Sequence, residues 1–277
     1  MCRIFGFRSV LDSRVHRSLL SAENALAVQS ERHPDGWGVA YYVAGSPHVI
    51  RSAGAAVTDQ LFQRVSGIVT SQTVLAHVRK ATQGELSPLN CHPFQYGRWV
   101  LAHNGDVPAF PEVRDPLLER VAPRFRRFLL GDTDSEVIFH LFLTHLAARA
   151  DLTRRGTPID QVVEALRATV ADVRGVLSER GHDPDSALLT LVVSDGELLV
   201  GHQGGKELHF STWKERCSER EGCPFLSREC EAPTESGYVN HLIVSSEPLL
   251  GENRWERLAP GELVGVDAFM RLARYRP

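Results

Sequence analysis

The chain has 277 residues, 43% of them hydrophobic, which is enough to bury a substantial core in one large domain or two small ones. Its 31 basic and 34 acidic residues give a net charge of -3, too weak a field to recruit nucleic acid or a membrane surface. With no apolar run of about 18 residues and no secretory signal, the sequence predicts a cytoplasmic protein with a small-molecule or protein partner.

Residues 1 to about 110 alternate short apolar runs with glycine-bearing turns, which predicts strands joined by turns. A helix is expected between His16 and Gln29. The predicted strands of this part are CRIFGF, GWGVAYYV, TVLAHVR and RWVLAHN.

The middle of the chain is predicted to be helical. Thr133 and Glu136 have the spacing of a capping box, and the following VIFHLFLTHLAARA is apolar on most sides, so this helix should be buried. A second helix is expected to start at Thr157-Pro158, because proline suits the first helical position and the following apolar residues have amphipathic spacing.

Strands are expected again towards the C-terminus, in ALLTLVVS, ELLVGHQ, ELHFST, YVNHLIVSS and ELVGVD. Asp195-Gly196 is typical of a hairpin turn between the first two of them. Residues 214–236 are polar and rich in turn formers, which predicts a surface loop. Strands, then helices, then strands indicate packed sheets with helices outside.

The five cysteines are an odd number and widely scattered, so reduced thiols are expected. Cys217, Cys223 and Cys230 lack the tight spacing of most zinc sites, and we predict neither a metal nor a cofactor. Three histidines in apolar runs are expected to be core residues with backbone partners: His77, His103 and His140.

The opening MCRIFGF raises the question of why a cysteine follows the initiator methionine. If Met1 is removed, Cys2 carries a thiol and a free α-amine, and an amine with a pKa of about 7.7–8.0 can accept the thiol proton near neutral pH. The alternative is that Cys2 is a small hydrophobic residue at the start of a strand.

Polar groups also stand at the ends of other predicted elements. Arg79 ends TVLAHVR. Its guanidinium could bind a substrate carboxylate through two parallel hydrogen bonds, or it could form a solvated ion pair at the edge of the site. Asn104 and Gly105 could converge on an oxyanion, or form an ordinary turn. Asp134, in a first helical turn, could hold an ammonium group or simply cap the helix.

Together, MCRIFGF, HPDGWG, AHVRKATQGE, NCHPF, AHNGDV and GDTDSEVI resemble, in this order, the glutaminase domain of the class II glutamine amidotransferases. These enzymes belong to the N-terminal-nucleophile hydrolase superfamily. The resemblance is dense over residues 2 to about 145, and SSEPL and LAPGELVGVD extend it. It implies an α+β fold, a four-layer αββα sandwich of two packed, mainly antiparallel sheets, in a single domain over residues 2–277.

The resemblance also implies the catalytic residues. Cys2 matches the nucleophile, and its α-amine matches the general base. Asn104 and Gly105 match the oxyanion hole. The implied reaction cleaves the side-chain amide of glutamine or another γ-glutamyl amide through a Cys2 thioester and releases ammonia or an amine.

The implied substrate-binding residues lie in three of the matched motifs. Arg79, with Thr82 beside it, matches the arginine that grips the substrate α-carboxylate, and Asp134 matches the acid that holds the α-amine. Gly36 and Trp37 of HPDGWG complete the predicted set.

One position departs from the pattern, because Lys80 stands where the synthases of the family commonly have an aromatic residue. Those synthases also append a large second domain, for which this chain leaves no room. The motifs look closer to the stand-alone branch, which includes a γ-glutamyl amide hydrolase of ergothioneine biosynthesis. Two alternatives stay open: a glutaminase subunit that delivers ammonia to a separate synthase, and a non-catalytic protein that binds γ-glutamyl ligands.

Overall fold

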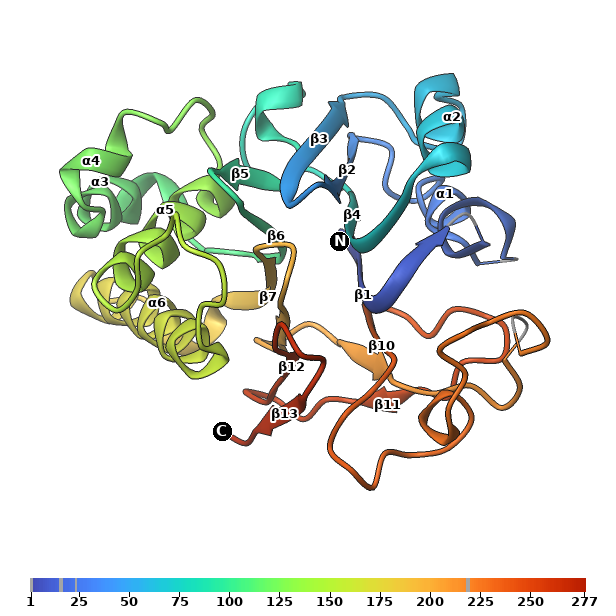
Figure 1. Cartoon of the computed structure of the whole chain (residues 1–277). Coiled ribbons are helices and arrows are strands. Elements are labelled where there is room, and N and C mark those ends of the chain that lie inside the picture. Colours follow the sequence, from blue (N-terminus) through green and yellow to red (C-terminus); the bar gives the residue numbers. More distant parts are fainter. Residues whose placement is uncertain (1, 15–16, 23, 218–219) are drawn as a thin grey trace.

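Two β-sheets lie face to face, with helices on their outer sides, in the computed structural model, which describes residues 2–14, 17–22, 24–217 and 220–277 (Figure 1). The first sheet has the strand order β11-β9-β10-β1-β4-β2-β3, and the second has the order β13-β12-β8-β7-β6-β5. All of these strand pairs are antiparallel.

The strands of the first sheet are β1 (Arg3–Arg14), β2 (Trp37–Val43), β3 (Ser46–Ser52), β4 (Thr70–Val78), β9 (His209–Ser211), β10 (His241–Ser245) and β11 (Glu256–Arg257). Those of the second are β5 (Phe94–Tyr96), β6 (Trp99–Asp106), β7 (Leu188–Ser194), β8 (Leu199–His202), β12 (Leu263–Val266) and β13 (Leu272–Tyr275). The α-helices are α1 (Leu26–Gln29), α2 (Gln60–Ile68), α3 (Phe110–Arg120), α4 (Pro123–Arg126), α5 (Asp134–Ala147) and α6 (Ile159–Glu179).

Three apolar cores separate four layers. One core fills the space between the sheets and includes Ile4 from β1 and Val100 from β6. A second lies between the first sheet and α1 and α2 and includes Phe62. The third lies between the second sheet and α3, α5 and α6 and includes Trp99 and Phe142. The predicted αββα sandwich of two antiparallel sheets is therefore confirmed.

Both faces of the central strands are buried, which explains why their sequences read as nearly continuous apolar runs. Neighbouring residues of a strand point to opposite faces. In β1, Ile4 faces the inter-sheet core and Phe5 faces the core beneath α1 and α2. In β6, Val100 faces the inter-sheet core and Trp99 faces the core beneath α3, α5 and α6.

The two sheets approach each other closely at Gly6, which lies within β1. A Cβ atom on Gly6 would lie 2.7 Å from Cγ2 of Val244 and 3.1 Å from Cγ1 of Val192, which belongs to the second sheet. Only a residue without a side chain fits this gap between the layers.

The central helix α5 begins where the sequence predicts. The Thr133 hydroxyl accepts a hydrogen bond from the backbone N–H of Glu136 at 3.3 Å, so Thr133 is the N-cap. The second half of the expected capping box is absent, because the Glu136 carboxylate instead accepts from the N–H groups of Leu130 and Gly131. Helix α6 starts one residue after Pro158, close to the expected start.

The helix expected between His16 and Gln29 is instead broken into a π-helical turn, η1 (Arg17–Ser21), and the four-residue α1. His16 lies outside the described residues. The break has a physical cause, since Ala25 is extended (ψ 161°) and Asn24 uses its side chain to bond the backbone of Pro248 and Leu250. These bonds tie the break to the segment that carries Pro248 and Leu250.

The described part of the segment 214–236 contains one short 3-10 turn, η4 (Arg228–Cys230), and an isolated bridge at Lys214. Among the described residues, no helix combines the length and the apolar character needed to cross a bilayer.

The predicted hairpin at Asp195-Gly196 joins β7 to β8, and it generates a prediction about stability. Gly196 has φ +92°, and a Cβ there would lie 2.4 Å from the buried ring of Tyr42. Gly181 has φ +79°, but apart from its own chain neighbours no described atom lies within 4 Å of its Cβ position. We expect Gly181→Ala to lower the free energy of unfolding by about 1 kcal/mol through backbone strain alone. Gly196→Ala should cost about 2–4 kcal/mol, because a steric clash is added.

Urea unfolding of the two variants measures the difference between them. Equal losses would contradict the packing of Tyr42 against this turn.

Candidate active site

Cys2 lies immediately before β1, and its thiol is held by the turn that follows β4. The antiparallel register pairs Arg3 with Val78, which brings Cys2 beside Lys80. The Cys2 sulfur accepts a hydrogen bond from the Lys80 N–H at 3.3 Å and lies 3.4 Å from the Lys80 carbonyl oxygen. Only 8% of Cys2 is exposed. The backbone of one residue therefore fixes the position of the sulfur atom.

Burial raises the pKa of the Cys2 thiol, and the hydrogen bond from Lys80 and the positive charge of Arg79 oppose that shift. The negative charge of Asp134 raises the pKa further. The charges of Arg79 and Asp134 thus shift the thiol pKa in opposite directions. Because the buried thiol is held in its protonated form, its attack on a substrate requires a base.

Arg79 is 3% exposed, and its own loop wraps around its guanidinium group. Nη2 donates to the carbonyl oxygens of Gln83 (2.6 Å) and Gly84 (3.4 Å), and Nη1 donates to that of Glu85 (3.1 Å). A guanidinium has five N–H donors, so these three bonds leave two for a ligand. The loop therefore holds the guanidinium in place and leaves donors for a carboxylate.

The turn at HPDG packs against the same segment. Asp35 donates its N–H to the Arg79 carbonyl (3.1 Å), Arg79 donates to the Gly36 carbonyl (2.7 Å), and the Asp35 carboxylate accepts from Ala81 (2.9 Å). Gly36 has φ +134°, and a Cβ there would lie 2.4 Å from the Cys91 sulfur. The role of Gly36 in this structure is to let the turn approach closely.

Trp37 does not line the site. Its side chain has no exposed surface, its indole N–H donates to Asp59 at 2.9 Å, and its ring packs edge-on against Phe62. Strand alternation directs the indole into the core beneath α2, so the role of Trp37 in substrate binding stays a prediction in which only its backbone is left to contact a ligand. Thr82 is exposed on the turn between Arg79 and the carbonyl groups that hold it.

Asn104 and Gly105 end β6 in the second sheet. The Asn104 amide donates to the Ser246 hydroxyl at 3.3 Å, and that hydroxyl also accepts from the N–H of Ile4 at 2.9 Å. Ser246 thus links the Asn104 side chain to β1, the strand that follows Cys2. A Cβ on Gly105 would lie 1.6 Å from the Leu188 carbonyl oxygen, so only glycine permits the pairing of β6 with β7 here.

Asp134 is 3% exposed and occupies the first position of α5. Oδ2 accepts from the N–H of Val107 at 2.9 Å, and Oδ1 accepts from the N–H and the hydroxyl of Ser135 at 2.7 and 3.0 Å. The carboxylate therefore ties the start of α5 to the chain that leaves β6, which carries Asn104.

Asn90 ties the Arg79 loop to the segment before α5. Its amide donates to the Glu85 carbonyl at 3.0 Å and to the Asp132 carboxylate, and its oxygen accepts from the Asp132 N–H at 3.1 Å. The loop that holds Arg79 is thereby fixed to the segment that holds Asp134.

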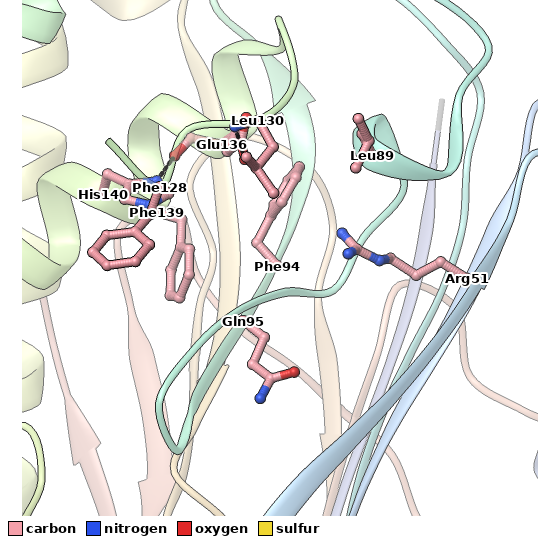
Figure 2. Close-up of a pocket in the computed structure, with 9 residues that line it drawn as sticks. All are labelled: Arg51, Leu89, Phe94, Gln95, Phe128, Leu130, Glu136, Phe139 and His140. Atoms are coloured by element: carbon pink, nitrogen blue, oxygen red, sulfur yellow. Dashed lines mark hydrogen bonds between the residues drawn. The ribbon is translucent and has the colours of Figure 1, made fainter. Parts of the chain in front are cut away.

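A small cavity opens beside α5, and Figure 2 shows the side chains around it. Its volume is about 50 Å³, and Arg51, Phe94, Glu136 and His140 contribute to its walls. Ligand pockets usually enclose about 300–1,000 Å³. The cavity is therefore too small to be a substrate pocket, and the Glu136 carboxylate is already occupied by the backbone bonds at the start of α5.

The expected core histidines are buried. His103 lies 2.8 Å from the Leu188 carbonyl oxygen, and His140 lies 2.8 Å from that of Glu136, as predicted for backbone partners. His77 differs, because its ring faces His92, with 3.4 Å between the two Nδ1 atoms. Burial lowers the pKa of His77 to about 3, so this ring is neutral.

Contributors that the sequence did not reveal include Ser246 and Gln83. Ser246 lies in SSEPL, a matched segment, but a serine in a polar turn carries no sign of its partner some 140 residues earlier in β6. Gln83 supplies a carbonyl to Arg79, and its side chain donates to Asp106 at 3.2 Å. The residue type gives no sign of a hydrogen bond that a backbone carbonyl accepts, so the sequence could not predict this contact.

The family model of the class-II glutamine amidotransferases matches residues 1–269. The probable glutamine amidotransferase DUG3 of Saccharomyces cerevisiae is 30% identical over 223 residues, which are 72% of this chain and 62% of the relative. The chain thus covers less than two thirds of that relative's length. The γ-glutamyl-hercynylcysteine sulfoxide hydrolase of Mycobacterium tuberculosis is 35% identical over 117 residues, 39% of this chain and 50% of the relative.

The fold is similar to that of a glutamine aminotransferase class-II domain protein from Silicibacter pomeroyi. The TM-score is 0.66 at 23% identity, with 99% of this chain and 98% of the other covered.

The environment of Cys2 generates a prediction about its reactivity. Because burial raises the thiol pKa, the thiolate fraction at pH 7 is smaller than that of a free cysteine. In a protein that carries an N-terminal extension, alkylation of Cys2 by iodoacetamide should therefore be slow at pH 7 and should accelerate only above the pH at which an exposed cysteine reacts.

Mass spectrometry of Cys2 peptides over a pH series measures this profile, and the same protein in urea serves as the control. A folded protein whose Cys2 reacts faster than the unfolded control at pH 7 would contradict the assigned environment.

Proposed function

Because the chain belongs to the class II glutamine amidotransferases, we propose that it hydrolyses γ-glutamyl amides, glutamine included, with Cys2 as the nucleophile. This proposal rests on the position of the Cys2 sulfur. The sulfur lies between the backbone N–H and C=O of Lys80, and the charges of Arg79 and Asp134 act on it. The active form has lost Met1, a residue outside the described part, so that the Cys2 amine supplies the missing base.

The charges around the thiol match the γ-glutamyl group. The positive guanidinium of Arg79 pairs with the substrate α-carboxylate through a remaining donor, and the Asp134 carboxylate accepts from the α-ammonium. Every γ-glutamyl amide presents these two charges at a fixed distance from the scissile carbon. Thr82, on the same turn as Arg79, borders this end of the substrate.

The reaction proceeds in two halves. The Cys2 amine takes the thiol proton, the sulfur bonds to the amide carbon, and Asn104 and Gly105 donate to the resulting oxyanion. The C–N bond then breaks, and the leaving nitrogen takes the proton from the amine. Water next adds to the thioester and gives its proton to the amine, and loss of the thiolate releases glutamate.

The side of the site beyond the scissile nitrogen determines the leaving group. Lys80 is exposed, and it stands where the synthases of the family commonly have an aromatic residue. The Mycobacterium tuberculosis relative is named for a substrate whose amine is far larger than ammonia, which supports a larger amine for this chain as well. We infer that the enzyme selects the acyl half strictly and the amine half loosely.

The test is a panel of γ-glutamyl amides that includes glutamine and an N-acetylated control, assayed for release of glutamate and of amine. We expect turnover of substrates with a free α-amine and α-carboxylate, an acyl-enzyme on Cys2 in the intact mass, and loss of both with Cys2→Ala. Efficient cleavage of the N-acetylated compound would refute the role of Asp134. Binding without turnover would indicate the non-catalytic alternative, and turnover that needs an added synthase would indicate the ammonia-delivering subunit.

Two substitutions separate binding from chemistry. Asn104→Ala should lower kcat about 100- to 1,000-fold, because one donor to the oxyanion is lost. Arg79→Lys should mainly raise KM, because lysine keeps the charge but loses the two-pronged geometry. Steady-state kinetics on the best amide of the panel measures both, and an Asn104→Ala enzyme with full turnover would remove this residue from the mechanism.

A further inference from the structure

Strand alternation at the end of β6 sends two neighbouring side chains to opposite faces of the second sheet. Asn104 points to the inter-sheet side, where it bonds Ser246. His103 points to the helix side, where it meets the first turn of α5. The strand that carries the oxyanion donor therefore also contacts the helix that carries Asp134.

The contact is a buried chain of three polar side chains. His103 Nε2 donates to the Leu188 carbonyl oxygen at 2.8 Å, since a carbonyl can only accept. The other ring nitrogen, Nδ1, lies 2.8 Å from the Ser135 hydroxyl, and that hydroxyl lies 3.0 Å from Oδ1 of Asp134. All three side chains are at most 5% exposed. Water therefore has little access to them, and the contacts are made within the protein.

Counting acceptor positions shows what the chain does for Asp134. A carboxylate has about four acceptor positions, two on each oxygen. The N–H and the hydroxyl of Ser135 occupy both positions of Oδ1, and the N–H of Val107 occupies one position of Oδ2. One position on Oδ2 remains for a ligand.

We propose that Ser135 and His103 are positioning residues for the substrate α-ammonium group, an inference that rests on the function proposed above for Asp134. The Ser135 hydroxyl saturates Oδ1, so that the carboxylate cannot rotate and its free position on Oδ2 faces the substrate. Because the hydroxyl gives its one hydrogen to Oδ1, it accepts from Nδ1 of His103, so both ring nitrogens of His103 are donors, one to Ser135 and one to the Leu188 carbonyl oxygen. Neither residue touches the reacting atoms, and their effect is confined to ligands that carry an α-amine.

The test compares two amides of the same amine, one γ-glutamyl and one glutaryl, which differ only in the α-amine. For Ser135→Ala, we expect kcat/KM for the γ-glutamyl amide to fall about tenfold, as for the loss of a hydrogen bond to a charged group, with the glutaryl amide changed less than about twofold. Ser135→Thr, which keeps the hydroxyl, should restore the preference. His103→Leu should act in the same direction, and the double variant should lose no more than either single one.

Ser66→Ala is the matched control. Ser66 is also a buried helical serine, but it lies in α2, on the other sheet, and its hydroxyl has no hydrogen-bond partner among the described residues. This variant should leave the ratio of the two amides unchanged. A merely structural role of Ser135 would lower both amides equally, and that result would overturn the inference.

The ratio of the affinities for the two acyl products, glutamate and glutarate, measures the same preference without turnover. A wild type that cleaves no γ-glutamyl amide refutes the proposed function. A wild type that cleaves them, and whose preference for the γ-glutamyl amide over the glutaryl amide survives in Ser135→Ala, refutes this inference alone. A wild type with no preference for glutamate over glutarate refutes the role of Asp134 and this inference with it.

Discussion

The hydrogen-bonded register between β1 and β4 determines where the site is built. Because Arg3 lies opposite Val78, the residue before β1 meets the residues after β4, and the Cys2 sulfur reaches the backbone of Lys80. A slip of one residue would turn every side chain of β1 to the other face of the sheet. Burial of Ile4 on one face and Phe5 on the other makes such a slip costly, so the cores on both sides of β1 fix the position of its first residues.

The remaining parts of the site come from the opposite sheet and its helices. Asn104 and Asp134 are joined to each other through Val107, and they are joined to the first sheet through Ser246 and Asn90. Two of these bonds are made to backbone groups, and two join side chains. The site is thus a set of cross-links between two rigid layers, which is why polar residues are tolerated so deep in an apolar sandwich.

Sequence patterns predicted those elements whose cause is local. Apolar runs marked the central strands, the Thr133 cap marked α5, and Asp195 followed by glycine marked a hairpin. Helix α3 was not predicted, because Pro116 inside it reads as a helix breaker, and only packing against α5 and α6 makes up for the lost bond. Helix α2 was also missed, although Asp59 caps it.

The candidate residues followed from motifs, and what could not be predicted was which face each one uses. Trp37 stands in a matched motif, yet its indole lies in a core. The contacts of Ser246 and Ser135 depend on strands and helices that meet only in the folded chain. Residue type and spacing carry information about chemistry, whereas orientation depends on tertiary packing.

The close approach of the sheets at Gly6 bears on how such a protein can change over evolutionary time. Cys2 precedes a strand of one sheet, and Asn104 and Gly105 end a strand of the other, so their separation depends on the spacing of the sheets. That spacing is set by the volumes of side chains such as Val192 and Val244, which touch no ligand. A single methylene gained or lost there changes the spacing between Cys2 and Asn104. Natural variation in the core can therefore change the geometry of the candidate site while each of its own residues stays the same.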